Sequence, residues 1–365
     1  MIGYTYIGYP LLLALITIFW RKNINKKSIS PSVSIIIAAH NEEKTIKKTL
    51  NSVLKLDYPI NKREIIVISD HSTDKTNQIV KKYKNVKLIV LPKRKGKTVA
   101  QNEAVKKTKG EILVFFDSGT LYKKNVLKEL IRNLNDPKIG CVTGNVIIKC
   151  NEKNLVSRGF KLYFKYDQFL IQKESKIGSL FQVNGPIYAI RKNLHEKLDE
   201  RLIRDFVIAS KMMKQNARTV YEKEAIAYEN PKQTPASDFK MRVRIAIQAY
   251  EGMREMVWLL NPFKSKFVAF TFFSHKILRY GSSILIFLLL FLNFLLLKES
   301  FYLSIFILQC IFYGFAILGL VFNKIHIKIP LFHIPYYITA GNIAIICGLI
   351  KYLGGDRKIT WQPRM

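Results

Sequence analysis

The sequence is poor in cysteine and lacks two common nucleotide-binding motifs. Its 365 residues include 4 cysteines, whose spacing does not match a set of metal ligands. We therefore expect reduced, structural cysteines, with a disulfide between Cys141 and Cys150 as the less favoured alternative in a reducing compartment. No Gly-x-Gly-x-x-Gly follows the first predicted strand and no Walker loop is present, which argues against a dinucleotide dehydrogenase and a P-loop ATPase.

Acidic residues are also scarce. The chain has 26 Asp and Glu against 59 Lys and Arg, a formal net charge of +33. A field of that sign predicts an anionic partner, which is nucleic acid, an anionic membrane surface or a phosphorylated substrate. The basic residues are spread along the chain without a recognised nucleic-acid-binding motif, so we expect no nucleic-acid partner.

Long apolar runs are present at both ends. Four runs without Asp, Glu, Lys or Arg cover residues 2–20, 282–297, 301–322 and 330–350. Because about 20 helical residues cross a hydrocarbon core of about 30 Å, these runs predict membrane helices. The expected organisation is a transmembrane helix over residues 1–21, a soluble domain over 30–262 and about three transmembrane helices over 281–353.

The charges that flank these runs predict an orientation. Arg21, Lys22, Lys26 and Lys27 follow the first run, which favours a soluble domain in the cytoplasm and an N-terminus outside the cell membrane. Residues 263–280 contain too many polar side chains to span and read as an amphipathic helix on anionic membrane lipids. Three later crossings would place the tail 354–365 outside, although its charges favour the cytoplasm. Either 330–350 is re-entrant or part of 263–280 crosses.

The soluble domain alternates strands and helices. Predicted strands over residues 32–39, 63–70, 86–91 and 111–117 are separated by predicted helices over 44–54, 75–83 and 98–107. This alternation predicts an α/β fold with a mostly parallel, doubly wound sheet. Right-handed crossovers bring the carboxyl ends of such strands to one edge, where ligands bind.

Charged residues stand at that edge. Glu42, Asp70, Lys97 and Asp117 each follow a predicted strand, and together they suit a nucleoside diphosphate. Asp70 can accept from the base or ribose, and Lys97 can offset pyrophosphate charge. Asp117 can bind ribose or a divalent cation, Mg²⁺ or Mn²⁺, that bridges phosphate oxygens.

Several motifs in order carry a resemblance. Residues 33–43, 67–74, 95–102, 116–117, 184–191, 204–205, 237–252 and 361–364 resemble the successive motifs of membrane-embedded family 2 inverting glycosyltransferases, the group that includes cellulose, hyaluronan and poly-N-acetylglucosamine synthases. The resemblance implies a GT-A-like, nucleotide-sugar-binding domain. It also implies a nucleotide diphosphate sugar as donor, here a UDP-sugar, and a glycan or lipid-linked acceptor.

The resemblance also implies roles for individual residues. Asp205, which by itself would read as a helix cap or a surface charge, corresponds to the general base. Asn184, Gly185 and Arg204 fall on the acceptor side. The donor and its departing diphosphate are assigned to Ala39, His40, Glu42, Asp70, Lys97, Asp117, Arg242 and Arg244, with Asp117 also on the metal. Arg242 and Arg244 could equally form the basic face of an interfacial helix.

Two departures from the family pattern leave alternatives open. The usual Asp-x-Asp reads Asp117-Ser118-Gly119, and Ile245 stands where processive members carry tryptophan. The favoured function is transfer to a polysaccharide or lipid-linked acceptor, with possible polymer synthesis and translocation. One alternative is a single-transfer enzyme acting on a polyprenyl phosphate or glycolipid. The other is a non-catalytic membrane scaffold.

Overall fold

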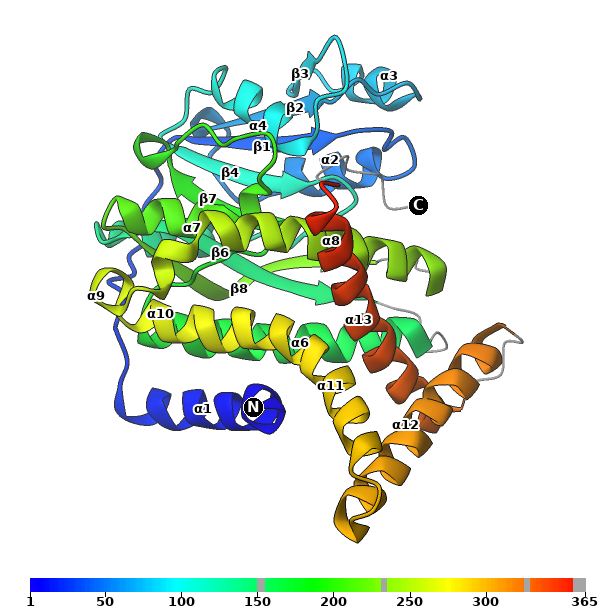
Figure 1. Ribbon diagram of the computed structural model, residues 1–365. Coiled ribbons are helices and arrows are strands. Elements are labelled where there is room, and N and C mark those ends of the chain that lie inside the picture. Colours follow the sequence, from blue (N-terminus) through cyan, green and yellow to red (C-terminus); the bar gives the residue numbers. More distant parts are fainter. Residues whose placement is uncertain (150–154, 231–234, 325–328, 357–365) are drawn as a thin grey trace.

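The structure, a computed structural model, describes residues 1–149, 155–230, 235–324 and 329–356. Its centre is an eight-stranded sheet with the order β3-β2-β1-β4-β7-β6-β8-β5 (Figure 1). The strands are β1 Val33–Ala39, β2 Arg63–Ser69, β3 Lys87–Val90, β4 Ile112–Asp117, β5 Leu121–Tyr122, β6 Ile139–Ile148, β7 Ile187–Arg191 and β8 Arg218–Glu229.

The fold class predicted from the sequence is confirmed. Strands β3, β2, β1 and β4 are parallel neighbours, and β6 pairs in parallel with β8. Strand β7 enters between the two parallel groups and is antiparallel to both β4 and β6. Since β4 and β7 are adjacent, the loop before β7 comes close to the carboxyl edge of the first group.

Two layers of helices cover the sheet, because side chains on a strand alternate between its faces. Ile35 and Ile37 of β1 pack with α2 (Ile46–Leu54), α3 (Thr76–Lys81) and α5 (Val126–Ile131). Ile36 and Ala38 face the other way and pack with α4 (Lys97–Val105) and α7 (Arg204–Lys214). The uninterrupted apolar strands in the sequence follow from this burial on both faces.

A helix occupies the range 1–21 that the sequence predicted as a transmembrane helix, and its crossing stays a prediction. A π-helical turn, η1 (Tyr4–Gly8, 5 residues), leads into α1 (Tyr9–Phe19, 11 residues). Residues 2 and 3 are helical as well, so the helix runs over residues 2–19; at about 1.5 Å per residue it spans about 27 Å, close to a hydrocarbon core of about 30 Å. The helix lies beside α6 (Leu155–Ile177) of the α/β domain (Figure 1). The Tyr9 hydroxyl donates to Glu174 Oε1 at 2.6 Å.

The segment predicted as a separate amphipathic helix over residues 263–280 is also different. After α9 (Pro262–Ser265), one helix runs through α10 (Phe267–Phe272), the π-helical turn η6 (Phe273–Ile277) and α11 (Leu278–Leu295). Lys264 and Lys266 are exposed. His275 and Arg279 are buried: His275 lies 2.8 Å from Glu174, and Arg279 donates to Asp167 at 3.0 Å. Pairing with α6 therefore explains the polarity of His275 and Arg279, two of the residues that suggested an interfacial helix.

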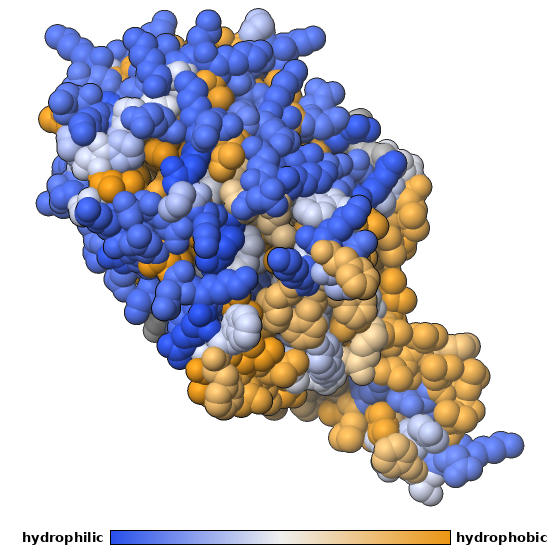
Figure 2. All heavy atoms as spheres, turned by 90° about the vertical axis from the view of Figure 1, so that its left-hand side faces the viewer, coloured by the Kyte–Doolittle hydropathy of each residue, from blue (hydrophilic) through white to orange (hydrophobic). Residues whose placement is uncertain are grey.

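Among the described residues, three helices are long and apolar enough to cross a membrane: Phe267–Leu295, Ser300–Phe322 and Leu331–Leu353. Helices α11 and α12 (Ser300–Lys324) form a V that points away from the sheet (Figure 1). Figure 2 shows hydrophobic side chains gathered on this part of the molecule, below the hydrophilic α/β domain. Helix α13 (Pro330–Leu353) contacts α12 and then packs against α8 (Pro235–Glu255).

The close contact between α13 and α8 needs a glycine. A Cβ at Gly348 would lie 2.5 Å from Cβ of Ala246 and 3.2 Å from the Val243 carbonyl oxygen. The later half of α13 is thus packed on a helix of the α/β domain. The remaining short helices are η2 Ile60–Lys62, η3 Arg132–Asn135, η4 Lys192–Leu194 and η5 Val257–Leu260.

Two predictions made from the sequence concern residues that the structure does not describe. Cys141 is buried with a free thiol, and its proposed disulfide partner Cys150 is not described. The motif at 361–364 and most of the tail 354–365 also lie beyond the described residues.

Candidate active site

An ion pair marks the carboxyl edge of the central strands. Asp117 ends β4, and Lys97 begins α4 after the glycine loop. Lys97 Nζ lies 2.5 Å from Asp117 Oδ1, and both side chains remain about one fifth exposed (23% and 21%). The pair is therefore in contact with solvent and accessible to a ligand at the edge where the sequence predicted a diphosphate site.

Asp70 builds the loop that carries Lys97. Its two carboxylate oxygens accept from the backbone N–H groups of Lys95 at 2.7 Å and Gly96 at 2.8 Å. Gly96 has φ +89°, a left-handed conformation that favours glycine. Besides any contact with the base or ribose, Asp70 thus fixes the backbone that directs Lys97 to Asp117.

The turn after β1 is tied to the same edge. The Ala39 carbonyl accepts from Asp70 N at 2.9 Å, and His40 Nδ1 lies 2.7 Å from the Asp70 carbonyl oxygen. Glu42 is 4% exposed, and its backbone N–H donates to Thr76 Oγ1 at 2.8 Å. These bonds hold the segment 39–42 beside the loop of Asp70.

Glu42 also lies near the position where the family pattern departs. Gly119 has φ +87°, and a Cβ there would meet only loose contacts, 3.9 Å from Thr45 and 4.0 Å from Glu42 Oε2. A Cβ at residue 119 would therefore meet no clash, but the left-handed backbone favours glycine there, and the Glu42 carboxylate borders the position.

Asp205 comes to this edge from α7. It is half-buried, and its carboxylate occupies the space beside Gly185 in the loop before β7. Burial raises the pKa of Asp205 above its usual range; the positive charge of Lys97 opposes this rise and the negative charge of Asp117 adds to it. Three elements distant in sequence thus bring Lys97, Asp117 and Asp205 within electrostatic reach of one another.

Asn184 and Arg204 fix the backbone next to Gly185 and Asp205. Asn184 Nδ2 donates to the Gly144 carbonyl at 2.6 Å and its N–H donates to Thr143 Oγ1 at 2.8 Å, which fixes the loop of Gly185. Arg204 is 2% exposed and its guanidinium binds Gln101, Asn102 and His195. Both residues, assigned to the acceptor, are positioned to hold Gly185 and Asp205.

Arg242 and Arg244, the two arginines assigned to the diphosphate, both lie on α8. Arg242 Nε donates to Asp238 at 2.7 Å, and its guanidinium carbon lies 4.0 Å from the centre of the Tyr337 ring on α13. Arg244 is half-buried on the same helix. Arg242 therefore points to the junction with the membrane helices, and the diphosphate role of both stays a prediction.

Sequence reasoning missed Lys276 as a neighbour of the site. Its Nζ donates to Gln182 Oε1 at 3.2 Å and lies 4.4 Å from the centre of the Phe206 ring. Its positive charge acts on the carboxyl of Asp205. The polar residues of 263–280 were the sequence feature that could have indicated this contact. A helical period alone, however, does not show which element packs against the polar face of a helix.

The site fits a divalent cation shared with substrate. No group of three or more His, Cys, Asp or Glu side chains in the described ranges could hold a metal ion alone. Mg²⁺, however, is usually held by one or two carboxylates together with substrate phosphates and water. Asp117, with open space at Gly119, would supply the protein ligand.

The eight-stranded, mostly parallel sheet with helices on both faces has the arrangement of a GT-A-like fold. Residues 34–198 match the family model described as glycosyl transferase family 2. This stretch of the chain is therefore similar to the family 2 glycosyltransferases, the family that the motifs of the sequence resemble.

Individual proteins agree with this assignment. The chain is 30% identical over 243 residues to a Bacillus subtilis (strain 168) protein named probable glycosyltransferase YdaM. It is 27% identical over 235 residues to a poly-beta-1,6-N-acetyl-D-glucosamine synthase of Staphylococcus epidermidis. Each match covers 62% of this chain and 56% of the relative, so the chain spans about half the length of the curated relatives it matches.

A solved structure extends the likeness of fold to nearly the whole chain. The mannosyltransferase PcManGT from Pyrobaculum calidifontis, in complex with GDP-Man and Mn²⁺, superposes with a TM-score of 0.70. The match covers 97% of both chains at 19% identity, which establishes a shared fold that includes the C-terminal helices.

Proposed function

We propose that this protein is a membrane-bound, inverting glycosyltransferase. It moves a sugar from a nucleotide diphosphate sugar to a polysaccharide or lipid-linked acceptor. The observation that carries the proposal is the placement of Asp205, an acid with a raised pKa, within electrostatic reach of Lys97 and Asp117 at the sheet edge. The family match and the names of the relatives support the same reaction class.

The residues fit the chemistry of inversion. Asp205 takes the proton from the acceptor hydroxyl while that oxygen attacks the anomeric carbon, and such a base contributes about 10²- to 10⁴-fold. The bond from the sugar to the diphosphate breaks, and Lys97 offsets the charge on the leaving group. A divalent cation held by Asp117 would neutralise further phosphate charge when bound.

A transfer assay tests the proposal and its alternatives. Purified protein is incubated with a panel of radiolabelled nucleotide sugars, including UDP- and GDP-linked donors, with Mn²⁺ or Mg²⁺. We expect cation-stimulated transfer from one donor, a UDP-sugar by the resemblance to synthases. The length of the labelled product separates a polymer from a single addition. If no donor in the panel is either transferred or hydrolysed, the result favours a non-catalytic scaffold.

For localisation, we propose that the V of α11 and α12 crosses the cell membrane while the catalytic domain lies in the cytoplasm. The apolar side chains of the V are exposed and its turn carries Lys298 and Glu299. Helix α1 lies along the inner surface, since Ile7, Leu11 and Ile18 are each more than 60% exposed opposite the face that packs on α6.

Single cysteines in a cysteine-free background test this topology. We expect Lys298→Cys to react with a membrane-impermeant maleimide added outside whole cells. Gly3→Cys and Gly355→Cys should react only after the cells are opened. Labelling of residue 3 from outside would restore the crossing predicted over residues 1–21, and labelling of residue 355 would make α13 a third crossing.

A further inference from the structure

Lys276 lies between the two segments that carry the proposed base. Its Nζ donates to Gln182 Oε1 at 3.2 Å and lies 4.4 Å from the centre of the Phe206 ring. Gln182 belongs to the loop before β7, and Phe206 directly follows Asp205 on α7. The loop and the helix are also bonded to each other, since the Val183 N–H donates to the Asp205 carbonyl oxygen at 2.9 Å. The ammonium group of Lys276 is therefore placed where loop and helix meet at the base.

The partners that the described part of the chain gives to this ammonium group are neutral. They are the amide of Gln182 and the rings of Phe206 and Tyr280, the second ring with its centre at 5.4 Å. Lys276 is half-buried. A positive charge that is partly removed from water and has neutral partners is costly unless an opposite charge lies near it.

The carboxylate of Asp205 supplies that opposite charge. Asp167 and Glu174 of α6 also attract Lys276, but both already pair with His275, at 3.2 Å and 2.8 Å. The attraction between Lys276 and Asp205 is mutual, because the lysine charge also acts on the Asp205 carboxyl.

A π-helical turn, η6, directs His275 and Lys276 to different neighbours. Such turns are rare and often lie at functional sites. His275 turns to α6, where its Nδ1 faces Glu174 and its Nε2 faces Asp167. Lys276, the next residue, turns to α7 and the loop before β7. The buried contacts of His275 thus fix the turn that presents Lys276 to the base.

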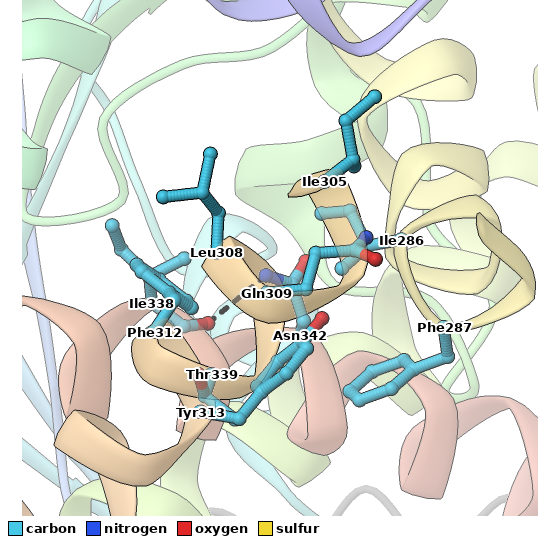
Figure 3. Close-up of a pocket in the computed structure, with 10 residues that line it drawn as sticks. All are labelled: Ile286, Phe287, Ile305, Leu308, Gln309, Phe312, Tyr313, Ile338, Thr339 and Asn342. Atoms are coloured by element: carbon cyan, nitrogen blue, oxygen red, sulfur yellow. Dashed lines mark hydrogen bonds between the residues drawn. The ribbon is translucent and has the colours of Figure 1, made fainter. Parts of the chain in front are cut away.

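The later part of the same helix is packed less closely. Ser283 Oγ donates to Asn342 Oδ1 on α13 at 2.8 Å. Beyond this bond, a cavity of about 310 Å³ lies between α11, α12 and α13, and mostly apolar side chains such as Phe287 and Leu308 converge on it (Figure 3). The position of Lys276 therefore depends on the contacts of η6 more than on the packing around the cavity.

The charged and titratable groups that act on Asp205 come from the elements around it: Lys97 of α4, Asp117 of β4, Tyr188 of β7, Lys276 of η6 and Arg204 of α7 itself. Lys97 and Asp117 are the pair that the diphosphate and its cation would engage. The contacts of Lys276 are with α7 and the loop before β7 instead, so its charge stays with the base when a donor is bound.

We propose that Lys276 is a positioning residue for transfer, whose ammonium group, held between Gln182 and Phe206, keeps the Asp205 carboxylate in its place beside Gly185. This inference rests on the proposed transfer reaction. Asp205 accepts the proton of the acceptor hydroxyl only as a carboxylate. A positive charge that the donor does not use therefore extends activity to lower pH.

The ionisation of Asp205 is measured first, without substrate. The full chain, with aspartate labelled by ¹³C at the side-chain carboxyl, is titrated in detergent by NMR, and the signal missing in Asp205→Asn identifies the base. We expect Lys276→Met to lower the acid dissociation constant of Asp205 about tenfold, since a nearby opposite charge favours the carboxylate. Lys264→Met, at an exposed lysine of α9, controls for the loss of one positive charge. An unchanged titration in Lys276→Met would overturn the proposal.

Steady-state kinetics separate a positioning role from acceptor binding. In Lys276→Met we expect kcat to fall about tenfold on the acidic side of the pH profile and to recover at higher pH, while KM for donor and acceptor stays within about twofold. Lys276→Arg keeps the charge and should restore most of the loss. Ile286→Val, on the cavity wall of α11, should leave the profile unchanged. A raised KM for the acceptor with an unchanged pH profile would make Lys276 a binding residue and overturn the proposal.

Failure of this inference and failure of the proposed function give different results. Transfer by the unaltered protein, together with an unchanged Asp205 titration in Lys276→Met, contradicts the role of Lys276 and leaves the transfer reaction intact. A shifted titration without transfer from any donor supports the pairing of Lys276 with Asp205 and contradicts the proposed function.

Discussion

Oδ2 of Asp205 occupies the space in which a side chain at residue 185 would begin, so the Asp205 carboxylate keeps this position only while residue 185 is glycine. A Cβ there would overlap Oδ2 and come within 3.0 Å of Cγ of Asp205. The contact links the loop before β7 to the first turn of α7, the two segments that approach the Lys97–Asp117 pair from the far half of the sheet.

Gly185→Ala should therefore displace the Asp205 carboxylate. We expect kcat to fall about 100-fold or more, since a misplaced base loses most of its contribution, while KM for the donor changes little. Steady-state kinetics with the identified donor measure both values. Gly281→Ala is the matched control, because no atom lies within 4 Å of a Cβ at that position. A normal kcat in Gly185→Ala would show that the carboxylate has another position available.

Asp205→Asn should abolish transfer without preventing donor binding. The amide keeps the shape of the side chain but cannot accept the proton, so the expected loss is about 10²- to 10⁴-fold in kcat. Nucleotide binding, measured by calorimetry, should remain within about twofold of the original. Asp199→Asn, a change to an exposed carboxylate that pairs with Arg201, controls for loss of one negative charge. Substantial turnover by Asp205→Asn would remove Asp205 from the role of base.

The raised pKa of Asp205 predicts a pH dependence of both activity and stability. The base acts only when ionised, so kcat should fall as the pH drops through the raised pKa. An acid whose pKa is higher in the folded state than in the unfolded state destabilises the fold above that pKa, because ionisation favours the unfolded chain. Asp205→Asn should thus raise Tm near pH 7.5, and the difference should disappear below about pH 4, the usual range of an aspartate.

Lys97→Met should weaken the donor rather than the chemical step alone. A lysine about 4 Å from a phosphate is worth up to about 4 kcal/mol at an effective dielectric of 20, and solvent contact reduces this, so we expect a rise of about 10- to 100-fold in the dissociation constant of the nucleotide sugar. Lys95→Met removes the same charge from an exposed side chain two residues earlier and should have a small effect. Similar losses in both variants would indicate only general electrostatic attraction.

Tyr9→Phe tests the attachment of the first helix. The change leaves Glu174, 1% exposed, without the hydroxyl that donates to it. Loss of one buried charge-assisted hydrogen bond costs about 1.5–3 kcal/mol, so Tm in detergent should fall by several degrees. Tyr4→Phe loses a bond to Ser274 at a partly buried position and should cost less. An equal effect of the two changes would argue against a special role for the Tyr9–Glu174 bond.

The strands and the sheet edge could be predicted from the sequence because they depend on local patterns. Runs such as residues 112–116 are apolar on both faces, and acids or Gly-Lys follow them directly. Helix alternation then fixes the direction of the first four strands. No local pattern predicts that β7 pairs antiparallel with β4 and β6. That pairing depends on where the chain returns to the sheet after the long helix α6.

The membrane helices were less predictable. The hydropathy of the sequence identifies the apolar residues of α1 and α13. It does not show whether lipid or another part of the protein packs against them. In α1 the contacts of Tyr9 with α6, and in α13 the contact of Gly348 with Ala246, decide the arrangement. The polar residues His275 and Arg279 suggested a helix on the membrane surface, but they are paired with acids of α6. These partners lie about 100 residues earlier in the sequence, so local hydropathy does not reveal them.

The bond between Tyr9 and Glu174 also constrains how the chain is made. The two residues are 165 positions apart, and at about 5–20 residues per second the ribosome needs roughly 10 to 30 seconds to reach the second after the first. During that interval an apolar helix is outside the ribosome without its partner. We expect the N-terminal segment to associate with the membrane surface or a chaperone while α6 is being synthesised, so that targeting precedes completion of the catalytic domain.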